Sequence, residues 1–163
     1  MSGFSADWLV LREPVDALSR NQELTAQLIA WQRQPGCLSV LDLGSGTGAN
    51  LRFLAPLLGD QQHWRLVDAD PALLDESVTR FADPAGVAVE RFCLDLTDSW
   101  KRLEAVKPTL VTASALLDLV SANWLESLAQ RCQAWRAGVL IVLSYDGTIV
   151  WEPELAGDHR ICA

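Results

Sequence analysis

Apolar residues along the chain fall into two alternating patterns: short continuous runs, and longer stretches in which they recur every three or four positions. The continuous runs are typical of buried strands, and the spaced ones are typical of amphipathic helices. The predicted strands lie at 37–44, 63–68, 87–95, 108–117 and 138–145. This alternation predicts an α/β fold, namely a Rossmann-like doubly wound sheet, mostly parallel, with helices on both faces.

Helix boundaries are indicated by proline, glycine and capping residues. A helix over 15–33 is expected to begin just after Pro14 and to end at Pro35-Gly36. Others are predicted over 49–59, 71–83 and 121–135, with a short one around 97–106. Asp70 and Ser121 are the expected N-caps of two of them.

The whole chain, 1–163, is expected to be a single domain with an N-terminal helix at 14–34, a core at 37–145 and a short hairpin and tail at 146–163. Asp146-Gly147 favours a two-residue turn, after which 148–151 would run back as an antiparallel edge strand. If nothing else covers the fifth strand, its edge is exposed and a homodimer through that edge is expected.

Composition narrows the classes of partner. With 13 Lys and Arg against 21 Asp and Glu, the formal net charge is −8. This makes nucleic acid an improbable partner and a small-molecule substrate the expected one. The N-terminal segment is not expected to be a signal peptide, and no apolar run approaches the ~20 residues that a membrane helix needs. Four cysteines without a CxxC pair suggest reduced thiols and a cytoplasmic location, and no ligand cluster for a metal surrounds either histidine.

The chemistry is concentrated in the glycine-rich turn that joins the first core strand to its helix. Gly44, Gly46 and Gly48 allow a tight turn and a close approach of a ligand to the backbone. The N–H groups at the start of the following helix suit polar or anionic ligand groups. Taken alone the turn is weak evidence, because Gly44, Gly46 and Ala49 also satisfy the looser GxGxxA pattern of dinucleotide-binding proteins.

Two acids sharpen the interpretation. Asp68 ends the second strand, where a carboxylate could accept both hydroxyl groups of a ribose, and Asp95 ends the third, near the expected position of an adenine amino group. Asp98 competes with Asp95 for that role. Because parallel strands end at the same edge of a sheet, these residues and the glycine turn are expected to form one pocket.

These motifs resemble those of the class I S-adenosylmethionine-dependent methyltransferases. VLDLGSGTGAN resembles the family's first motif, LVDADP its second-strand motif, CLDLTD its adenine-contacting segment and TASALLDL the segment after the fourth strand. More narrowly, LREP, QHWRLVDADPALL and LVTASALLDLVS resemble an uncharacterised bacterial branch of small enzymes. Members of that branch continue well beyond residue 163, so we expect this chain to be truncated at its C-terminus.

The resemblance implies that S-adenosylmethionine is the cofactor. Asp42 would bind its amino group, fix the loop amides, or do both. Arg12 and Arg20 would close over its carboxylate, unless they are solvated surface residues. Asp118, after the fourth strand, is the candidate catalytic residue; its alternative role is that of a helix-start carboxylate. The full set of expected cofactor-binding residues is Asp42, Gly44, Ser45, Gly46, Gly48, Asn50, Asp68, Ala69, Asp95, Leu96 and Ser114.

Three functions stay open at this point. The first is methyl transfer from S-adenosylmethionine to a small molecule, which needs alignment and exclusion of water more than a metal. The second is a non-catalytic cofactor-binding module, or a truncated half of a longer methyltransferase. The third is an NAD-dependent oxidoreductase, against which stands the single tyrosine, Tyr145, without a lysine nearby in the sequence.

Overall fold

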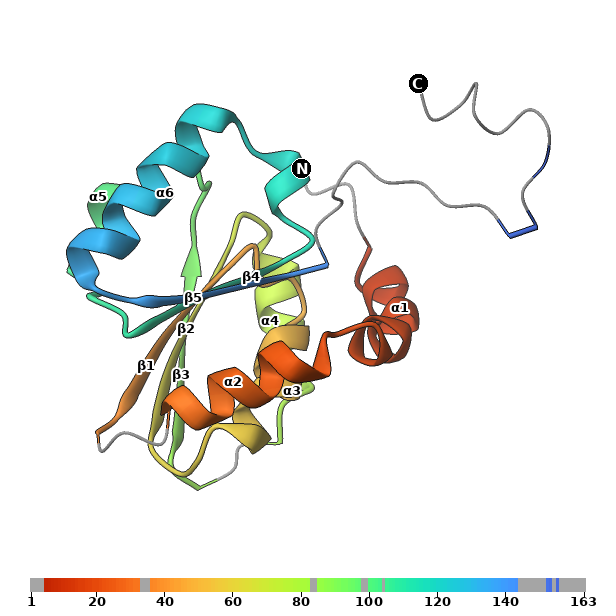
Figure 1. Cartoon of the computed structure of the whole chain (residues 1–163), viewed down its shortest axis with the longest axis horizontal. Coiled ribbons are helices and arrows are strands. Elements are labelled where there is room, and N and C mark those ends of the chain that lie inside the picture. The colour runs from red at the N-terminus through yellow and green to blue at the C-terminus, as the bar shows by residue number, and fades with distance from the viewer. Residues whose placement is uncertain are drawn as a thin grey trace.

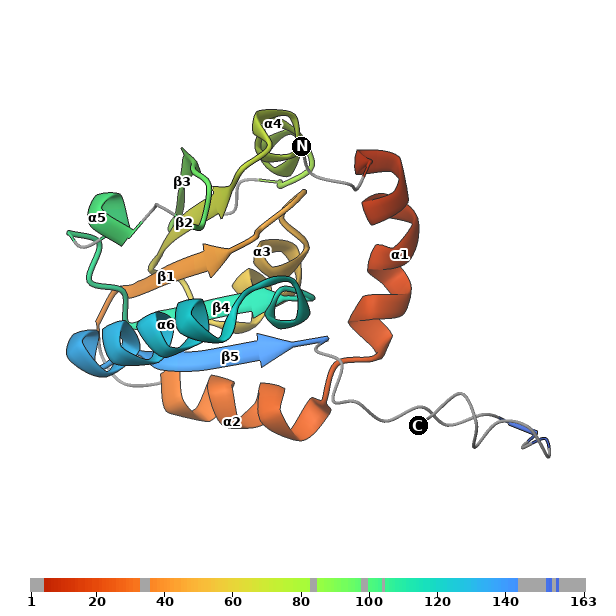
Figure 2. The same cartoon turned by 90° about the horizontal axis from the view of Figure 1, so that it is seen from above.

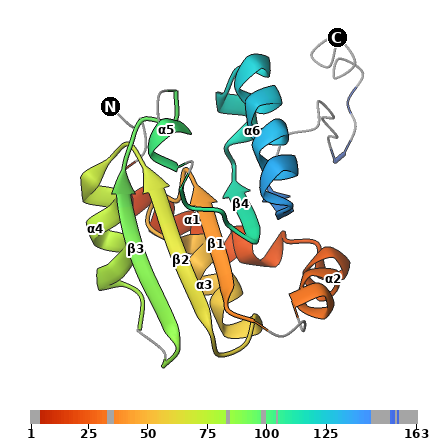
Figure 3. The same ribbon diagram turned by 90° about the vertical axis from the view of Figure 1, so that its left-hand side faces the viewer.

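The computed structural model describes residues 5–32, 36–82, 85–97, 100–103, 105–143, 152–153 and 155. Its five strands form one parallel sheet in the order β3-β2-β1-β4-β5. Figure 3 shows β3, β2, β1 and β4 side by side with their arrowheads pointing the same way. The strands are β1 (Leu38–Leu43), β2 (Gln62–Asp68), β3 (Val87–Cys93), β4 (Leu110–Ser114) and β5 (Gly138–Val142). The predicted α/β fold is confirmed, and the predicted hairpin at 146–151 lies outside the described residues.

Helices cover both faces of the sheet, as predicted (Figure 1). On one face lie α2 (Gln22–Gln32), α3 (Ala49–Leu54) with the 3-10 turn η1 (Ala55–Leu57), and α4 (Pro71–Thr79); on the other lie α5 (Trp100–Leu103) and α6 (Ala122–Trp135). Each face has its own apolar core, because alternate residues of a strand point to opposite faces. Val40 packs with Leu51 on the first face, and Leu41 with Leu128 on the second.

The N-terminal helix differs from the prediction. Instead of one helix over 15–33, there are two, α1 (Ala6–Leu18) and α2, with a break between them. The first starts early because the Ser5 hydroxyl caps it, accepting from the Trp8 N–H, so Pro14 lies inside the helix. The second starts at a new cap, since the Asn21 side chain accepts from the Leu24 N–H at 3.0 Å.

The capping residues expected at Asp70 and Ser121 do cap α4 and α6. Among the tryptophans on α2 and α6, Trp124 is buried and Trp135 half-buried, whereas Trp31 on α2 is 40% exposed. None of the helices in the described part of the chain is both long and apolar enough to cross a membrane.

Helix α1 lies across the end of the sheet at which the arrowheads point, as Figure 2 shows. This is the edge where the carboxyl ends of the parallel strands meet, and the strand order reverses there between β1 and β4. Open α/β sheets bind their ligands at such a switch point. The fold therefore sets α1 over the expected site.

Candidate functional site

The glycine turn is held in shape by the second strand. Gly44, Gly46 and Gly48 all have positive φ, which side chains other than glycine rarely adopt. Gly48 also caps α3, and a Cβ there would lie 3.0 Å from the Ser77 Cβ. The Ser45 N–H donates to the Val67 carbonyl at 3.0 Å, which fastens the turn to β2. The three glycines therefore have a structural role that no other residue type fills without strain.

Asp68, at the end of β2, is hydrogen-bonded both to the glycine turn and to the start of α4. One carboxylate oxygen accepts from the Gly46 N–H at 2.8 Å, and the other accepts from the Asp70 N–H at 2.9 Å. Each carboxylate oxygen offers about two lone-pair positions, so both atoms retain capacity for a further donor. The carboxylate is thus fixed in position and still able to accept a hydroxyl hydrogen.

A cavity of about 540 Å³ opens beneath α1 at the carboxyl ends of the strands. Seven of the eleven predicted cofactor-binding residues line it: Gly44, Gly46, Asp68, Ala69, Asp95, Leu96 and Ser114. A smaller recess of about 70 Å³ shares its walls at the glycine turn and also includes Ser45 and Asn50. The sequence-predicted set is therefore brought together in one place, apart from Asp42 and Gly48, which lie below the lining.

Asp95 is exposed at the rim of this cavity. Its Oδ1 accepts from the Thr97 N–H at 2.8 Å and from the Thr97 hydroxyl at 2.7 Å. These two hydrogen bonds lower the pKa of the Asp95 carboxyl. The Asp95 carboxylate is therefore charged, and its oxygens can accept further hydrogen bonds from a donor such as an amino group. Its rival, Asp98, lies outside the described residues.

Asp42 has a different position from the one expected. It is fully buried, and its Oδ1 accepts from the Asn50 side-chain amide at 3.0 Å; no cavity wall includes it among the described cavities. The Asn50 oxygen in turn accepts from the Arg20 guanidinium at 2.7 Å. Asp42, Asn50 and Arg20 thus form a buried chain from β1 to the break between α1 and α2. The structure therefore places Asp42 beneath the glycine turn, hydrogen-bonded to Asn50, and its contact with a cofactor amino group stays a prediction.

Burial controls the charge of Asp42. Removal of the carboxyl from water raises its pKa to about 7, against the lowering influence of Asn50 and Arg20. Its Oδ2 has no hydrogen-bond partner among the described residues. Arg20 is likewise buried, and the same desolvation lowers the pKa of its guanidinium. This hydrogen-bonded series therefore contains Asp42, whose ionisation is costly, and Arg20, a buried cation.

The two arginines singled out in the sequence separate in the structure. Arg12 lines both the main cavity and its recess, where it is paired with Asp16. Arg20 lines neither, and its interpretation as a solvated surface residue is wrong, because only 7% of it is exposed. The reason is the unexpected break after α1, which directs Arg20 inward over the Phe53 ring.

Several lining residues were not predicted. Leu9 belongs to the part of α1 that the sequence pattern did not identify as helical. Others follow the strands observed in the structure: Thr97 comes after β3, and Ala115, Leu116, Leu119 and Val120 come after β4, which ends before the predicted 108–117 does. The residues after the strand ends could have been predicted from the sequence, because apolar residues at that place near a switch point commonly line the ligand pocket.

Asp118 is not brought to the site by the described residues. It lies on the 3-10 turn η2 (Leu117–Leu119), its side chain is exposed, and it is absent from the linings of the cavities described here. In the described part of the chain no cluster of three or more His, Cys, Asp or Glu residues could hold a metal.

Comparison with known proteins identifies the family. A family model described as "Methyltransferase domain" matches residues 40–137, which run from β1 to the start of β5 and include the glycine turn, Asp68 and Asp95. The chain belongs to this family of methyltransferase domains. The match covers more than half of the chain, and it confirms the resemblance drawn from the motifs. No curated protein matches the sequence.

Solved structures similar to this methyltransferase domain support the fold. A cyclopropane-fatty-acyl-phospholipid synthase-like protein from Lactobacillus casei has a TM-score of 0.53 and 23% identity, over 81% of this chain and 49% of that one. The plantazolicin methyltransferase BpumL, solved with SAH, has a TM-score of 0.51 and 14% identity, over 82% and 47%. The CurJ carbon methyltransferase has a TM-score of 0.55 and 15% identity, over 85% and 41%. The chain spans about half the length of these structures.

Proposed function

We propose that this domain binds S-adenosylmethionine in the main cavity and transfers its methyl group to a small-molecule acceptor. The observation that carries the proposal is the convergence of the glycine turn, Asp68 and the Asp95 rim on one cavity beneath α1. Membership of the methyltransferase family and the SAH held by BpumL support the choice of cofactor. The cavity, about 540 Å³, is within the size range of small-molecule sites.

The residues fit a nucleoside with a polar tail. Asp68 would accept the ribose hydroxyls with its remaining lone pairs, while Asp95 would accept from the adenine amino group. Leu96, Leu119 and Val120 supply apolar surface for the adenine ring. The recess at the glycine turn suits the amino-acid end, because the Ser45 hydroxyl there is buried without a hydrogen-bond partner among the described residues.

Arg12 is the cation of this recess. Its guanidinium lies 4.7 Å above the Trp8 ring and pairs with Asp16, so both its position and its orientation are restrained. Asp16 already occupies the Nε of Arg12 and one Nη2 hydrogen, so Arg12 would bind the carboxylate of the amino-acid end with Nη1 and the remaining Nη2 hydrogen. Because Arg12 and Leu9 come from α1, binding would hold this helix against the glycine turn.

When bound, S-adenosylmethionine would supply a methyl group activated by its sulfonium; the acceptor atom would form the new bond to carbon as the carbon–sulfur bond breaks and leaves its electron pair on sulfur. The protein would align the methyl donor with the acceptor atom and exclude water from both. Ala115 and Leu116, which follow β4, form the apolar wall beside Ser114. Helix α1 closes the opposite side.

A catalytic role for Asp118 is a weaker part of the proposal, since its carboxylate is exposed and outside the lining. It would act on an acceptor proton only with a shift of η2. Self-association through the β5 edge also stays a prediction: Val139 on that strand is 51% exposed, and light scattering of the purified chain tests it.

Thermal unfolding with ligands tests the proposed function. S-adenosylhomocysteine at about 1 mM is expected to raise the unfolding midpoint by several degrees, and NAD is expected to leave it unchanged, because a ligand stabilises the state it binds. Methyl transfer is tested by the formation of S-adenosylhomocysteine from S-adenosylmethionine in a bacterial extract from which macromolecules have been removed by filtration. Stabilisation without product in that fraction would favour the non-catalytic module, and stabilisation by NAD instead would favour an oxidoreductase.

A further inference from the structure

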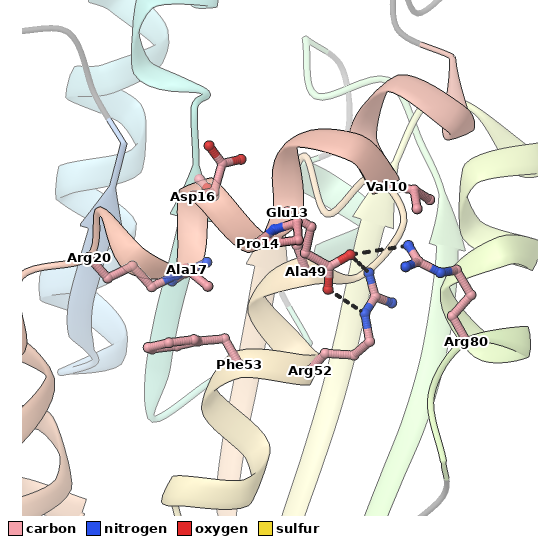
Figure 4. Close-up of a pocket in the computed structure, with 11 residues that line it drawn as sticks. Val10, Glu13, Pro14, Asp16, Ala17, Arg20, Ala49, Arg52, Phe53 and Arg80 are labelled. Carbon is pink, nitrogen blue, oxygen red and sulfur yellow. Dashed lines mark hydrogen bonds and ion pairs between the residues drawn. The ribbon is translucent and has the colours of Figure 1, made fainter.

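A second cavity, of about 390 Å³, lies along the neighbouring stripe of α1. On α1, Leu9 and Arg12 face the cofactor side, whereas Val10, Glu13 and Ala17 face this one at helical spacing. Asp16 lines both sides, and Arg20 joins the second cavity from just beyond the helix. Its other wall is formed by α3 and by Arg80 at the end of α4 (Figure 4). Helix α1 is therefore a ridge between two cavities, and only one of them is needed for the cofactor.

The two cavities meet at the carboxyl end of β4. Ser114, at the carboxyl end of β4, lines the main cavity, its recess and the second cavity. Asp16 and Ala49 line both the recess and the second cavity. A molecule in the second cavity would thus lie next to whatever occupies the amino-acid end of the cofactor site.

Two of the three arginines in this cavity are neutralised by carboxylates. The Glu13 carboxylate accepts from Arg52 at 2.7 Å through both oxygens and from Arg80 at 3.1 Å, as the dashed lines in Figure 4 show. Burial by itself raises the pKa of Glu13, but the hydrogen bonds and charges of the two arginines outweigh it and lower the pKa. Arg80 has a second carboxylate in Glu76, at 3.9 Å.

Arg20 is the third: it forms no ion pair with a described carboxylate, and the strongest attraction on its charge comes from Asp42, which it reaches only through Asn50. Only 7% of it is exposed, its guanidinium lies 4.4 Å above the Phe53 ring, and its sole hydrogen bond in the described part of the chain goes to neutral Asn50. Its Nε and Nη1 have no acceptor among the described residues, and no carboxylate of those residues lies within 4.0 Å. Two unpaired nitrogens on a buried guanidinium are costly, so the wall of the second cavity at Arg20 is a place for an anion.

We propose that the second cavity binds the methyl acceptor and that the acceptor is a small carboxylic acid held by Arg20. This rests on the proposed function, which it deepens by naming the substrate class. Three arginines and two carboxylates, Glu13 and Asp16, line the cavity, so one positive charge is in surplus. A single carboxylate balances that charge, whereas a phosphate dianion would exceed it and be repelled by Glu13 and Asp16. Val10, Pro14 and Phe53 give the rest of the cavity an apolar lining, which suits an acid with a short hydrocarbon body.

Ligand-observed NMR tests the proposal on the whole chain. The probes are acetate, isobutyrate, benzoate and phenylacetate, each beside its primary amide, which keeps the shape and removes the charge. At least one acid is expected to bind tenfold or more tightly than its amide, both alone and with saturating S-adenosylhomocysteine. Arg20→Met is expected to lower affinity for that acid at least tenfold and affinity for S-adenosylhomocysteine less than twofold.

Arg12→Met is the matched variant on the other side of α1. It is expected to lower the affinity for S-adenosylhomocysteine and to leave the affinity for the acid unchanged. The proposal is overturned if no acid binds more tightly than its amide, a comparison that needs no variant and so holds even where Arg20→Met fails to fold. It is also overturned if Arg20→Met weakens S-adenosylhomocysteine as much as the acid, because Arg20 then serves the cofactor. Failure of S-adenosylhomocysteine to bind at all refutes the proposed function separately.

Discussion

Replacement of Asp42 by asparagine tests the electrostatics beneath the glycine turn. The side chain is fully buried on β1, and burial raises its pKa from an ordinary 3.8 to about 7. That difference is about three pKa units, and at roughly 1.4 kcal/mol per unit it corresponds to ~4 kcal/mol. This is the extra cost of ionising Asp42 in the folded chain rather than in the unfolded one.

The sign of the effect follows from proton uptake. Between about pH 4 and 7 the folded chain holds the Asp42 proton and the unfolded chain has lost it, so the free energy of unfolding decreases as pH rises through this window. The asparagine of the variant cannot ionise. The stability of the wild type relative to Asp42→Asn is therefore expected to fall by about 4 kcal/mol from about pH 4 to about pH 8.

Urea unfolding followed by tryptophan fluorescence, at half-unit steps between about pH 4.5 and 8.5, measures this difference. Other titrating groups are common to both chains and largely cancel. Asp60→Asn, at an exposed position beside the opposite edge of the sheet, is the control, and its curve should run parallel to that of the wild type. Parallel curves for Asp42→Asn as well would refute the reasoning, because they would mean that Asp42 is ionised at no extra cost.

Three other changes have expected outcomes. Gly48→Ala, at a φ of +82° and facing a close neighbour, should lower the free energy of unfolding by about 1–3 kcal/mol in the same urea assay. Glu13→Gln should loosen α1 from Arg52 and Arg80, so that limited proteolysis cleaves α1 several times faster; an unchanged rate would mean that the ion pairs do not hold the helix. Asp118→Asn should leave the affinity for S-adenosylhomocysteine unchanged, since its carboxylate lies outside the cavity, and a tenfold weakening by calorimetry would contradict that placement.

The parts of the site that the sequence predicted are those set by local signals. Strand ends, the glycine turn and the cap at Asp70 each depend on a few consecutive residues. Parallel strands then bring Asp68 and Asp95 to one edge without further information, because the topology leaves few alternatives. The seven predicted residues that line the main cavity follow from these rules.

The parts that the sequence did not predict depend on contacts between distant segments. The apolar spacing from 15 to 33 continues across the break at Ser19–Asn21, so periodicity alone could not separate α1 from α2. With the break missed, Arg20 had no reason to be buried, and its bond to Asn50, thirty positions away, has no local signature. Asp42 was likewise expected in the pocket, but the same buried chain keeps it below the floor.

Calorimetric titration with S-adenosylhomocysteine tests the central claim most directly, comparing the unchanged chain with Asp68→Ala and with Asp60→Ala as a control at the far edge of the sheet. Hydrogen bonds to a charged group are worth about 1.5–3 kcal/mol, so the loss of Asp68 should weaken binding at least tenfold. We expect micromolar binding that Asp68→Ala weakens at least tenfold and Asp60→Ala leaves unchanged. Binding that survives the Asp68 substitution unchanged would contradict it.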